Sequence, residues 1–279
     1  FRHHFGASQL RSSAGPVQTP ARFDLSGAYC VNIPADGSSV ASQRKNSFAM
    51  MQAGLTTGVH AWELVLTHDK DGGECSCFGL AQRPVPSVGY ADNQSMWLVR
   101  AFNGKLYHRG RLLDGRRAHK CRAGSRVRLV YNANSGTLAY TVFPVGSRTA
   151  IDCGVLLRDV VPDVPGAPLY PVVAFYSGHR QVDVASPVCS FDSWSEYDSF
   201  IRSADPSTPL STLCGSAPPP PASPVSPSRA LSATDMTASS SMQLLPLSGS
   251  RHTLYSATAT SMPCTTPSND LLPVRHQQE

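Results

Sequence analysis

The sequence predicts an all-β protein, an antiparallel two-sheet β-sandwich with disordered termini. Between about Phe23 and Asp183 the chain consists of short apolar runs separated by Gly, Asn and Asp, which is the pattern of strands joined by tight turns. Helical periodicity is confined to residues 193–202. From Pro206 onward about half of the residues are Pro, Ser or Thr, and such a composition buries too little apolar surface to offset the entropy of folding.

The first clear strand is predicted over residues 60–66. Trp62, Leu64 and Leu66 alternate with other residues, so the three side chains share one face, and Gly58 supplies the preceding turn. Many such short strands closed by turns are typical of two sheets packed face to face.

The remaining strands follow at regular spacing. The run 77–81 contains Gly79, which indicates a bulge or a close backbone approach. Turns of the Asn-Gly or Asn-Ser-Gly type join two further pairs of runs into hairpins: 95–100 with 106–108, and 126–131 with 137–143. The last buried run is 169–176, where Pro171 is expected at a bulge or an edge because it cannot donate to a ladder.

The composition divides the chain into four parts. We expect a flexible lead-in over 1–22, the sandwich over 23–185, a short extension over 186–205 with a helix near its middle, and a disordered tail over 206–279. The chain begins with Phe and not with Met, which suggests a fragment of a longer protein.

The charge and hydropathy of the chain favour neither nucleic acid nor membrane as a partner. The 24 Lys and Arg residues outnumber the 19 Asp and Glu residues only mildly, and apolar runs stay far shorter than a membrane span. The most basic stretch, residues 109–128, is interpreted as a solvated hairpin and its loop. Alternation in that stretch is expected to point Arg126 and Arg128 outward to water.

The eight cysteines are dispersed along the chain, and only Cys75 and Cys77 are close. Because no second close Cys or His pair completes a zinc spacing, free thiols in a reducing compartment are favoured over a metal site. The sequence therefore predicts an intracellular protein, cytoplasmic or nuclear, with no metal and no cofactor.

The chain shows no pattern typical of an enzyme. A nucleophile with a base and an orienting acid, a phosphate-cradling loop and a His-Glu-x-x-His motif are all missing. Asp69, Asp71 and Glu74 form an acidic turn that could hold calcium in a lectin-like sandwich, although a plain surface loop is favoured. A carbohydrate-binding sandwich thus stays open as an alternative function.

Four motifs in register resemble the SPRY (B30.2) family. They are Gly-Val-His-Ala-Trp-Glu-Leu at 58–64, Phe-Gly-Leu-Ala at 78–81, Asn-Ser-Gly-Thr-Leu at 134–138 and Leu-Tyr-Pro-Val-Val at 169–173. The middle portion, with Ser-Val-Gly-Tyr at 87–90, is similar to the SPRY domains of SOCS-box, F-box and large multidomain ubiquitin ligases. The sequence departs from the family at Val130–Tyr131–Asn132, which leaves loop conformations open more than the fold.

The resemblance implies a bent sandwich without catalysis whose loops at one end bind a peptide or a protein surface. It would make the chain a substrate-recruiting part of a ubiquitin ligase. By the same resemblance the binding residues would be Tyr90 and the stretch Tyr176, Ser177 and Gly178 after the last buried strand, with Arg100 facing the same loops. For Tyr90, packing of the loop and binding of a partner are equally weighted, and for Tyr176 and Arg100 a plain structural or solvated role is favoured.

Residues 208–214 are similar to the opening of a SOCS box, the element through which that family contacts Elongin C. Gly215 and the four prolines from Pro218 prevent the helix that should follow. Chance similarity is therefore favoured over an Elongin C contact.

Overall fold

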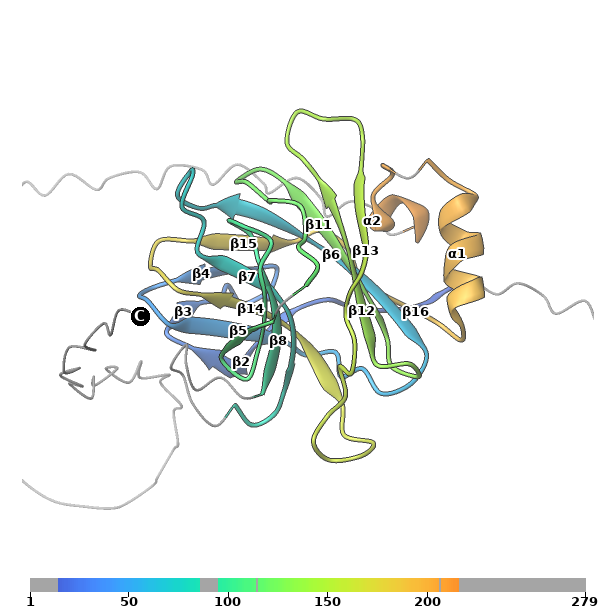
Figure 1. Ribbon diagram of the computed structural model, residues 1–279, viewed down its shortest axis with the longest axis horizontal. Coiled ribbons are helices and arrows are strands. Elements are labelled where there is room, and N and C mark those ends of the chain that lie inside the picture. The colour runs from blue at the N-terminus through green and yellow to red at the C-terminus, as the bar shows by residue number, and fades with distance from the viewer. Residues whose placement is uncertain (1–14, 86–94, 114, 206, 216–279) are drawn as a thin grey trace, which may run out of the picture. The chain divides into compact units, whose positions relative to one another are not determined.

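The computed structural model describes residues 15–85, 95–113, 115–205 and 207–215, and it confirms the predicted all-β sandwich. Two antiparallel sheets pack face to face, and two short helices lie beside the strands β16 and β13 (Figure 1). Within the described ranges, the longest helix has nine residues, and none is long and apolar enough to cross a membrane.

One sheet has nine strands, in the order β13-β12-β11-β6-β15-β4-β3, and the long strand β6 also pairs with β16, which pairs with β1. Its strands are β1 (Val17–Thr19), β3 (Val31–Asn32), β4 (Ser39–Ser42), β6 (Val59–His68), β11 (Arg126–Asn132), β12 (Thr137–Phe143), β13 (Ile151–Leu157), β15 (Gln181–Val184) and β16 (Val188–Phe191).

The other sheet has seven strands in the order β10-β9-β8-β7-β14-β5-β2. Its strands are β2 (Phe23–Tyr29), β5 (Ser47–Met51), β7 (Ser76–Gln82), β8 (Met96–Arg100), β9 (Leu106–His108), β10 (Arg111–Leu113) and β14 (Leu169–Phe175). Although β14 is a central strand, Pro171 lies where it pairs only with β7, because pairing with β5 begins at Val172.

The main core lies between the two sheets. The predicted face of β6, with Trp62, Leu64 and Leu66, is fully buried there. Phe78 of β7 and Phe175 of β14 belong to the same cluster. Period-two alternation therefore located the inner side of β6 correctly.

Both predicted hairpins and the predicted close approach are confirmed. The hairpin of β11 and β12 closes at the pair Asn132 and Thr137, and β8 pairs with β9 across the Asn-Gly turn. A Cβ atom on Gly79 would lie 1.8 Å from the carbonyl oxygen of Trp97, so only glycine fits where β7 passes β8.

The predicted helix is α1 (Trp194–Arg202), followed by the single turn α2 (Leu210–Leu213). Ser193 caps α1 by accepting a hydrogen bond from the Glu196 amide, and the Glu196 carboxylate accepts one from the Asp192 amide. Tyr197 of α1 and Leu210 of α2 are buried in a second apolar cluster on the outer side of the nine-stranded sheet. Both helices therefore cover that side of the sandwich.

Packed chain extends beyond the predicted range 23–185 at both ends. β1 lies within the predicted lead-in and pairs with β16, which lies within the predicted extension. Beyond the expected boundary at 206, residues 207–215 are also described, and Leu210 in that stretch is fully buried. Short segments of this kind carry too little periodicity to be recognised, because tertiary pairing and not local pattern holds them.

Candidate functional site

Arg100 and Tyr176 come together at one end of the seven-stranded sheet. Arg100 lies opposite Cys77 in the β7–β8 ladder, and the Tyr176 amide donates to the Cys75 carbonyl over 3.0 Å. Arg100 also hydrogen-bonds Tyr107. Burial raises the pKa of the Cys77 thiol, and Arg100 and Tyr176 act in the opposite direction. The half-buried Arg100 therefore folds over the sheet, which corrects the expectation that it is a freely solvated side chain.

Ser177 and Gly178 lie at the same end. The Ser177 carbonyl accepts a hydrogen bond from the Ser42 hydroxyl at 3.1 Å, and a Cβ atom on Gly178 would lie 3.3 Å from the Cα of Arg44. Their backbone thus packs on the connection between β4 and β5. The structure brings Arg100, Tyr176, Ser177 and Gly178 together, whereas Tyr90 lies outside the described residues.

An open pocket of about 500 Å³ lies on the outer face of the seven-stranded sheet, which we call the pocket face. Its lining combines apolar and polar groups from β2, β5 and the segment after β7: Ser26, Gly27, Ala28, Phe48, Met50, Arg83, Pro84 and Val85. No sequence pattern marks these residues as a set, because three separate segments contribute them. The pairing of β2 with β5 is what makes them neighbours.

The pocket walls Phe48 and Met50 belong to the same apolar cluster against which Tyr176 packs. Within the β5–β14 ladder, Met50 pairs with Val172 and Phe48 pairs with Ala174, two residues before Tyr176. Val85 also lines the pocket. The pocket therefore lies beside the strands that lead to Tyr176, one of the binding residues that the sequence predicted.

Arg83 forms the fixed polar wall of the pocket. Its guanidinium donates to the Asp24 carboxylate at 2.9 Å and to the Met51 carbonyl at 3.2 Å, and it lies 4.3 Å from the ring centroid of Tyr170. Ser26 donates to Asp24, and these hydrogen bonds, followed by Arg83, hold the pKa of the Asp24 carboxyl below its usual 3.8. Arg83 is thus pre-positioned before any ligand arrives.

Aromatic side chains frame the pocket face. Tyr29, Tyr107, Tyr170 and Tyr176 are partly buried around a cluster that includes Phe48, Met50 and Leu98. Tyr29 and Phe48 stack with ring centroids 6.3 Å apart. Tyrosine offers large stiff contact area together with a polar hydroxyl, which is why it is enriched at protein interfaces.

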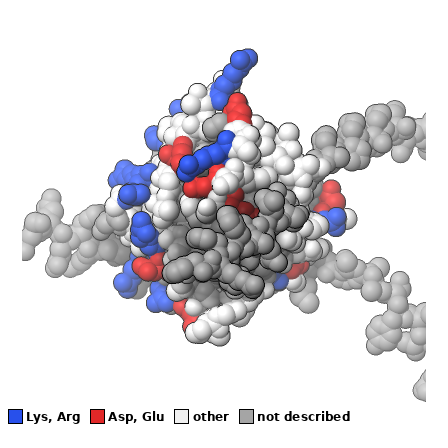
Figure 2. Space-filling view, turned by 90° about the vertical axis from the view of Figure 1, so that its right-hand side faces the viewer, with Lys and Arg blue, Asp and Glu red and all other residues white. Residues whose placement is uncertain are grey.

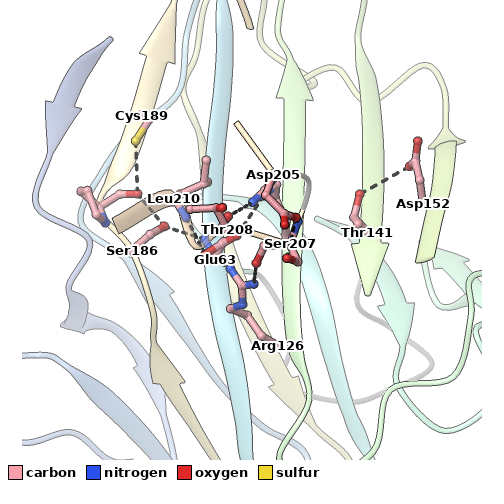
Figure 3. Close-up of polar contacts among 12 residues, drawn as sticks. Glu63, Arg126, Thr141, Asp152, Ser186, Cys189, Asp205, Ser207, Thr208 and Leu210 are labelled. Carbon is pink, nitrogen blue, oxygen red and sulfur yellow. Dashed lines mark hydrogen bonds and ion pairs between the residues drawn. The ribbon is translucent and has the colours of Figure 1, made fainter. Parts of the chain in front are cut away.

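The outer face of the nine-stranded sheet, which we call the covered face, has a different chemistry. Glu63 of β6 is fully buried there and accepts hydrogen bonds from Arg126 at 2.7 Å, from Arg128 at 2.8 Å and from the Leu210 amide at 3.0 Å (Figure 3). The two arginines in turn donate to the carbonyls of Ser207 and Thr208.

The prediction that Arg126 and Arg128 point to water was wrong. Alternation correctly gave both arginines the face of β11 opposite the core, but residues 207–213 and α1 cover that face. Arg128 keeps only 3% of its surface exposed. A covering segment that lies about 80 residues further along the chain cannot be seen in strand periodicity.

The acidic turn is also less exposed than expected. Asp69 and Glu74 are buried, and Asp69 accepts hydrogen bonds from the amides of Lys70, Cys75 and Ser76 and forms an ion pair with Arg180. Asp69 therefore organises the β6–β7 connection as a structural carboxylate. In the described part of the chain, no three His, Cys, Asp or Glu side chains are grouped closely enough to hold a metal ion.

The charges on the molecular surface are mixed. On the face that Figure 2 shows, Lys and Arg gather mainly along one edge, with Asp and Glu side chains between them. Arg109 of the basic stretch is paired with Asp163 at 3.1 Å. A long polyanion placed on this face would meet charges of both signs.

Comparison with known proteins gives no matching family model. Among solved structures, the chain is similar to the SPRY domain of human HERC1, with 24% identity and a TM-score of 0.50 over 61% of this chain and 98% of that chain. The TRIM65 PSpry domain matches with 14% identity and a TM-score of 0.44 over 60% of this chain and 92% of that chain. The Neuralized-NHR1 domain of Drosophila melanogaster matches with 12% identity and a TM-score of 0.41 over 60% and 98%. The HERC1 match shows that the sandwich has a SPRY-like fold, as the sequence resemblance predicted.

Proposed function

We propose that this SPRY-like domain is a protein-interaction module without catalysis, which binds a short peptide segment of a partner protein on the pocket face. The observation that carries the proposal is the open pocket of about 500 Å³ on the outer face of the seven-stranded sheet. Phe48, Met50 and Val85 give it apolar walls, and Arg83 gives it a fixed hydrogen-bonding side. Recognition sites of this kind combine an apolar pocket with few polar groups that set orientation.

The chemistry of the pocket favours an apolar or aromatic anchor from the partner. The charge of Arg83 is already balanced by Asp24, so burial of a partner carboxylate there would lack a free counter-charge. An anchor side chain would replace water over Phe48 and Met50. The tyrosines at the rim would then contact the flanking peptide backbone.

We propose that the binding residues predicted from the sequence form the rim of the pocket face. Tyr176, Ser177, Gly178 and Arg100 would contact the segment of the partner that leaves the pocket along β5 and β14. Tyr90 lies outside the described residues, and its proposed contact with the partner rests on the sequence resemblance alone.

We also propose that the partner is a substrate delivered to a ubiquitin ligase, an assignment that rests on the sequence resemblance alone. The Elongin C contact has little support. Leu210, on which the similarity to a SOCS box depends, is fully buried, and α2 has only four residues. An Elongin C contact would first require release of this segment from the covered face.

The binding proposal can be tested with a phage-displayed random peptide library selected on the full chain. We expect enriched peptides that share an apolar or aromatic anchor. Val85→Trp, which fills the pocket from a partly exposed wall beside Phe48 and Met50, should weaken their binding at least tenfold. Val145→Trp, at a 59% exposed residue outside the pocket, is the matched control and should bind like the unchanged chain.

Absence of any enriched peptide, or equal binding by Val85→Trp and Val145→Trp, would contradict the proposal. The carbohydrate-binding alternative is checked in parallel on immobilised sugars. Retention of the chain on a sugar resin that is lost in Val85→Trp would replace the protein-binding function by a lectin-like one.

A further inference from the structure

Cys189 and Cys214 pack in the same apolar cluster although 25 residues separate them in sequence. Gln18 of β1 pairs directly with Cys189 of β16, so the two side chains share one face of the sheet. The Gln18 side-chain amide donates to the Cys214 carbonyl, which brings the end of α2 onto that same face. Figure 3 shows Cys189 on the side of the sheet where Leu210 and Ser186 lie.

Both cysteines belong to the apolar cluster beneath the helices of the covered face. Cys189 is fully buried in it, whereas Cys214 is partly exposed at its edge. A small solute can therefore reach Cys214 but not Cys189. The pair combines an accessible thiol with a shielded one, as a reactive thiol and a resolving thiol require.

The pKa values of the two thiols are shifted in opposite directions, as a reactive thiol and a resolving thiol require. The nearby Cys189 thiol, with Arg128 as a weaker contributor, lowers the pKa of Cys214. The nearby Cys214 side chain, followed by burial, raises the pKa of Cys189. Burial raises the pKa of the thiols of Cys77, Cys121 and Cys153, so these are poorer nucleophiles.

We propose that Cys189 and Cys214 form an oxidation site that takes a hydroperoxide and closes into a disulfide between β16 and the end of α2. The Cys214 thiolate attacks one peroxide oxygen, and the O–O bond breaks to give a sulfenic acid and hydroxide. The Cys189 sulfur then attacks the Cys214 sulfur, the S–S bond forms, the S–O bond breaks, and the hydroxyl leaves as water after taking a proton. In total, two thiols lose two electrons and two protons, and hydrogen peroxide becomes two molecules of water.

The disulfide would fix the C-terminal segment of the folded domain. Residues 207–213 cover Arg126, Arg128 and Glu63 through non-covalent contacts alone, and Cys214 follows this segment directly. A covalent link at Cys214 would hold the segment in place when thermal motion opens those contacts. This inference is independent of the function proposed for the pocket face.

The experiment treats the full chain with a small excess of hydrogen peroxide, removes it with catalase, alkylates the free thiols and digests with trypsin. Cleavage after Arg180, Arg202 and Arg229 gives peptides 181–202 and 203–229, each with one cysteine. We expect these two peptides linked, lighter than their sum by two hydrogen atoms, in most treated chains. Dithiothreitol should separate them.

Matched variants make the test specific. Cys214→Ser should abolish the link, and Cys153→Ser, at another partly exposed cysteine, should leave it unchanged. In Cys189→Ala, Cys214 should proceed to sulfinic acid because the resolving thiol is gone. If burial of Cys189 makes that variant unfold, Cys214→Ser still decides the matter.

Two results would overturn the proposal. One is a treated chain in which Cys189 is alkylated after denaturation as fully as in the untreated chain. The other is a Cys214 that links to any cysteine except Cys189. Trypsin treatment of the oxidised native chain gives an independent check, because fragments cut at Arg202 should separate only after reduction.

Discussion

The covered face and the pocket face lie on opposite outer sides of one sandwich and differ in what completes them. On the covered face, the buried carboxylate of Glu63 meets two arginines and a backbone amide from the same chain. On the pocket face, Arg83, Phe48 and Met50 line an open volume of about 500 Å³, and tyrosines pack around the same apolar cluster. The covered face is completed by the chain itself, whereas the pocket face is the one on which we propose that a partner binds.

The difference has an energetic basis. A buried charge is tolerated only when partners surround it, and the covered face uses its own C-terminal segment for this. The pocket face can stay open without such a segment, because Arg83 is already paired with Asp24 and no buried charge is left without a partner there. Substitutions on the covered face should therefore lower stability. Substitutions in the pocket should lower peptide binding and leave stability almost unchanged.

The largest effect on stability is expected from Glu63→Ala on the covered face. The substitution leaves Arg126 and Arg128 without their counter-charge, and Arg128 is 3% exposed. We expect the free energy of unfolding to fall by about 3–5 kcal/mol in urea denaturation. Asp198→Ala, which breaks an exposed ion pair with Arg202, is the control and should cost less than about 0.5 kcal/mol. Similar losses of unfolding free energy for both variants would show that Glu63 does not hold Arg126 and Arg128 in place.

Leu210→Ala should give the next largest effect. Leu210 is fully buried in the cluster below α1 and α2, so its truncation leaves a cavity and weakens the docking of residues 207–213. We expect a loss of about 2–4 kcal/mol and faster proteolysis after Arg202. Thr212→Ala, at an exposed position of the same helix, should behave like the unchanged chain. Equal proteolysis rates for the two variants would contradict the docking.

A change of pH should have a moderate effect on the free energy of unfolding, because each sheet contains a histidine whose pKa is lower in the folded chain. Burial is the largest cause that lowers the pKa of His60 in β6 and of His108 in β9 below 6.5. Each histidine binds its proton more tightly in the unfolded chain than in the folded chain. Its contribution to the free energy of unfolding is therefore complete above pH 6.5 and is lost as the pH falls through the lower pKa of the folded chain.

We therefore expect the free energy of unfolding to decrease between about pH 7 and pH 5.5, by at most about 1.4 kcal/mol per histidine and pH unit. His60→Gln and His108→Gln should each flatten part of this slope in denaturation measured across that range. A slope that neither variant changes would assign the dependence to other groups.

The smallest effect on stability should come from Val85→Trp on the pocket face. The added ring enters the open volume next to Phe48 and Met50 and should change the free energy of unfolding by less than about 0.5 kcal/mol. Peptide binding should nevertheless fall at least tenfold. A loss of stability comparable to that of Leu210→Ala would mean that the pocket is part of the packed core.

Much of the fold could be predicted from the sequence because it is encoded locally. Alternation placed Trp62, Leu64 and Leu66 in the core, and the Asn-Ser-Gly turn placed the hairpin after Asn132. The capping pair Ser193 and Glu196 accompanies the correctly predicted helix α1. Each of these features depends on residues within one element.

The site was only partly predictable, since it depends on contacts between distant segments. Arg100 and Tyr176 were expected at one place and do lie together around Cys77. The role of Arg83 follows from its contacts with Asp24 and Met51, which lie 59 and 32 residues away in the chain. Local periodicity contains no information on such pairs.

The most direct test of the account is amide hydrogen–deuterium exchange of the full chain with and without a saturating peptide from the library selection. We predict slower exchange in the segments that line the pocket, residues 26–29, 48–51 and 82–85, and at 174–178, with unchanged exchange in α1 and α2. Slower exchange confined to α1, α2 and β16, with the pocket segments unaffected, would contradict the assignment of the two faces.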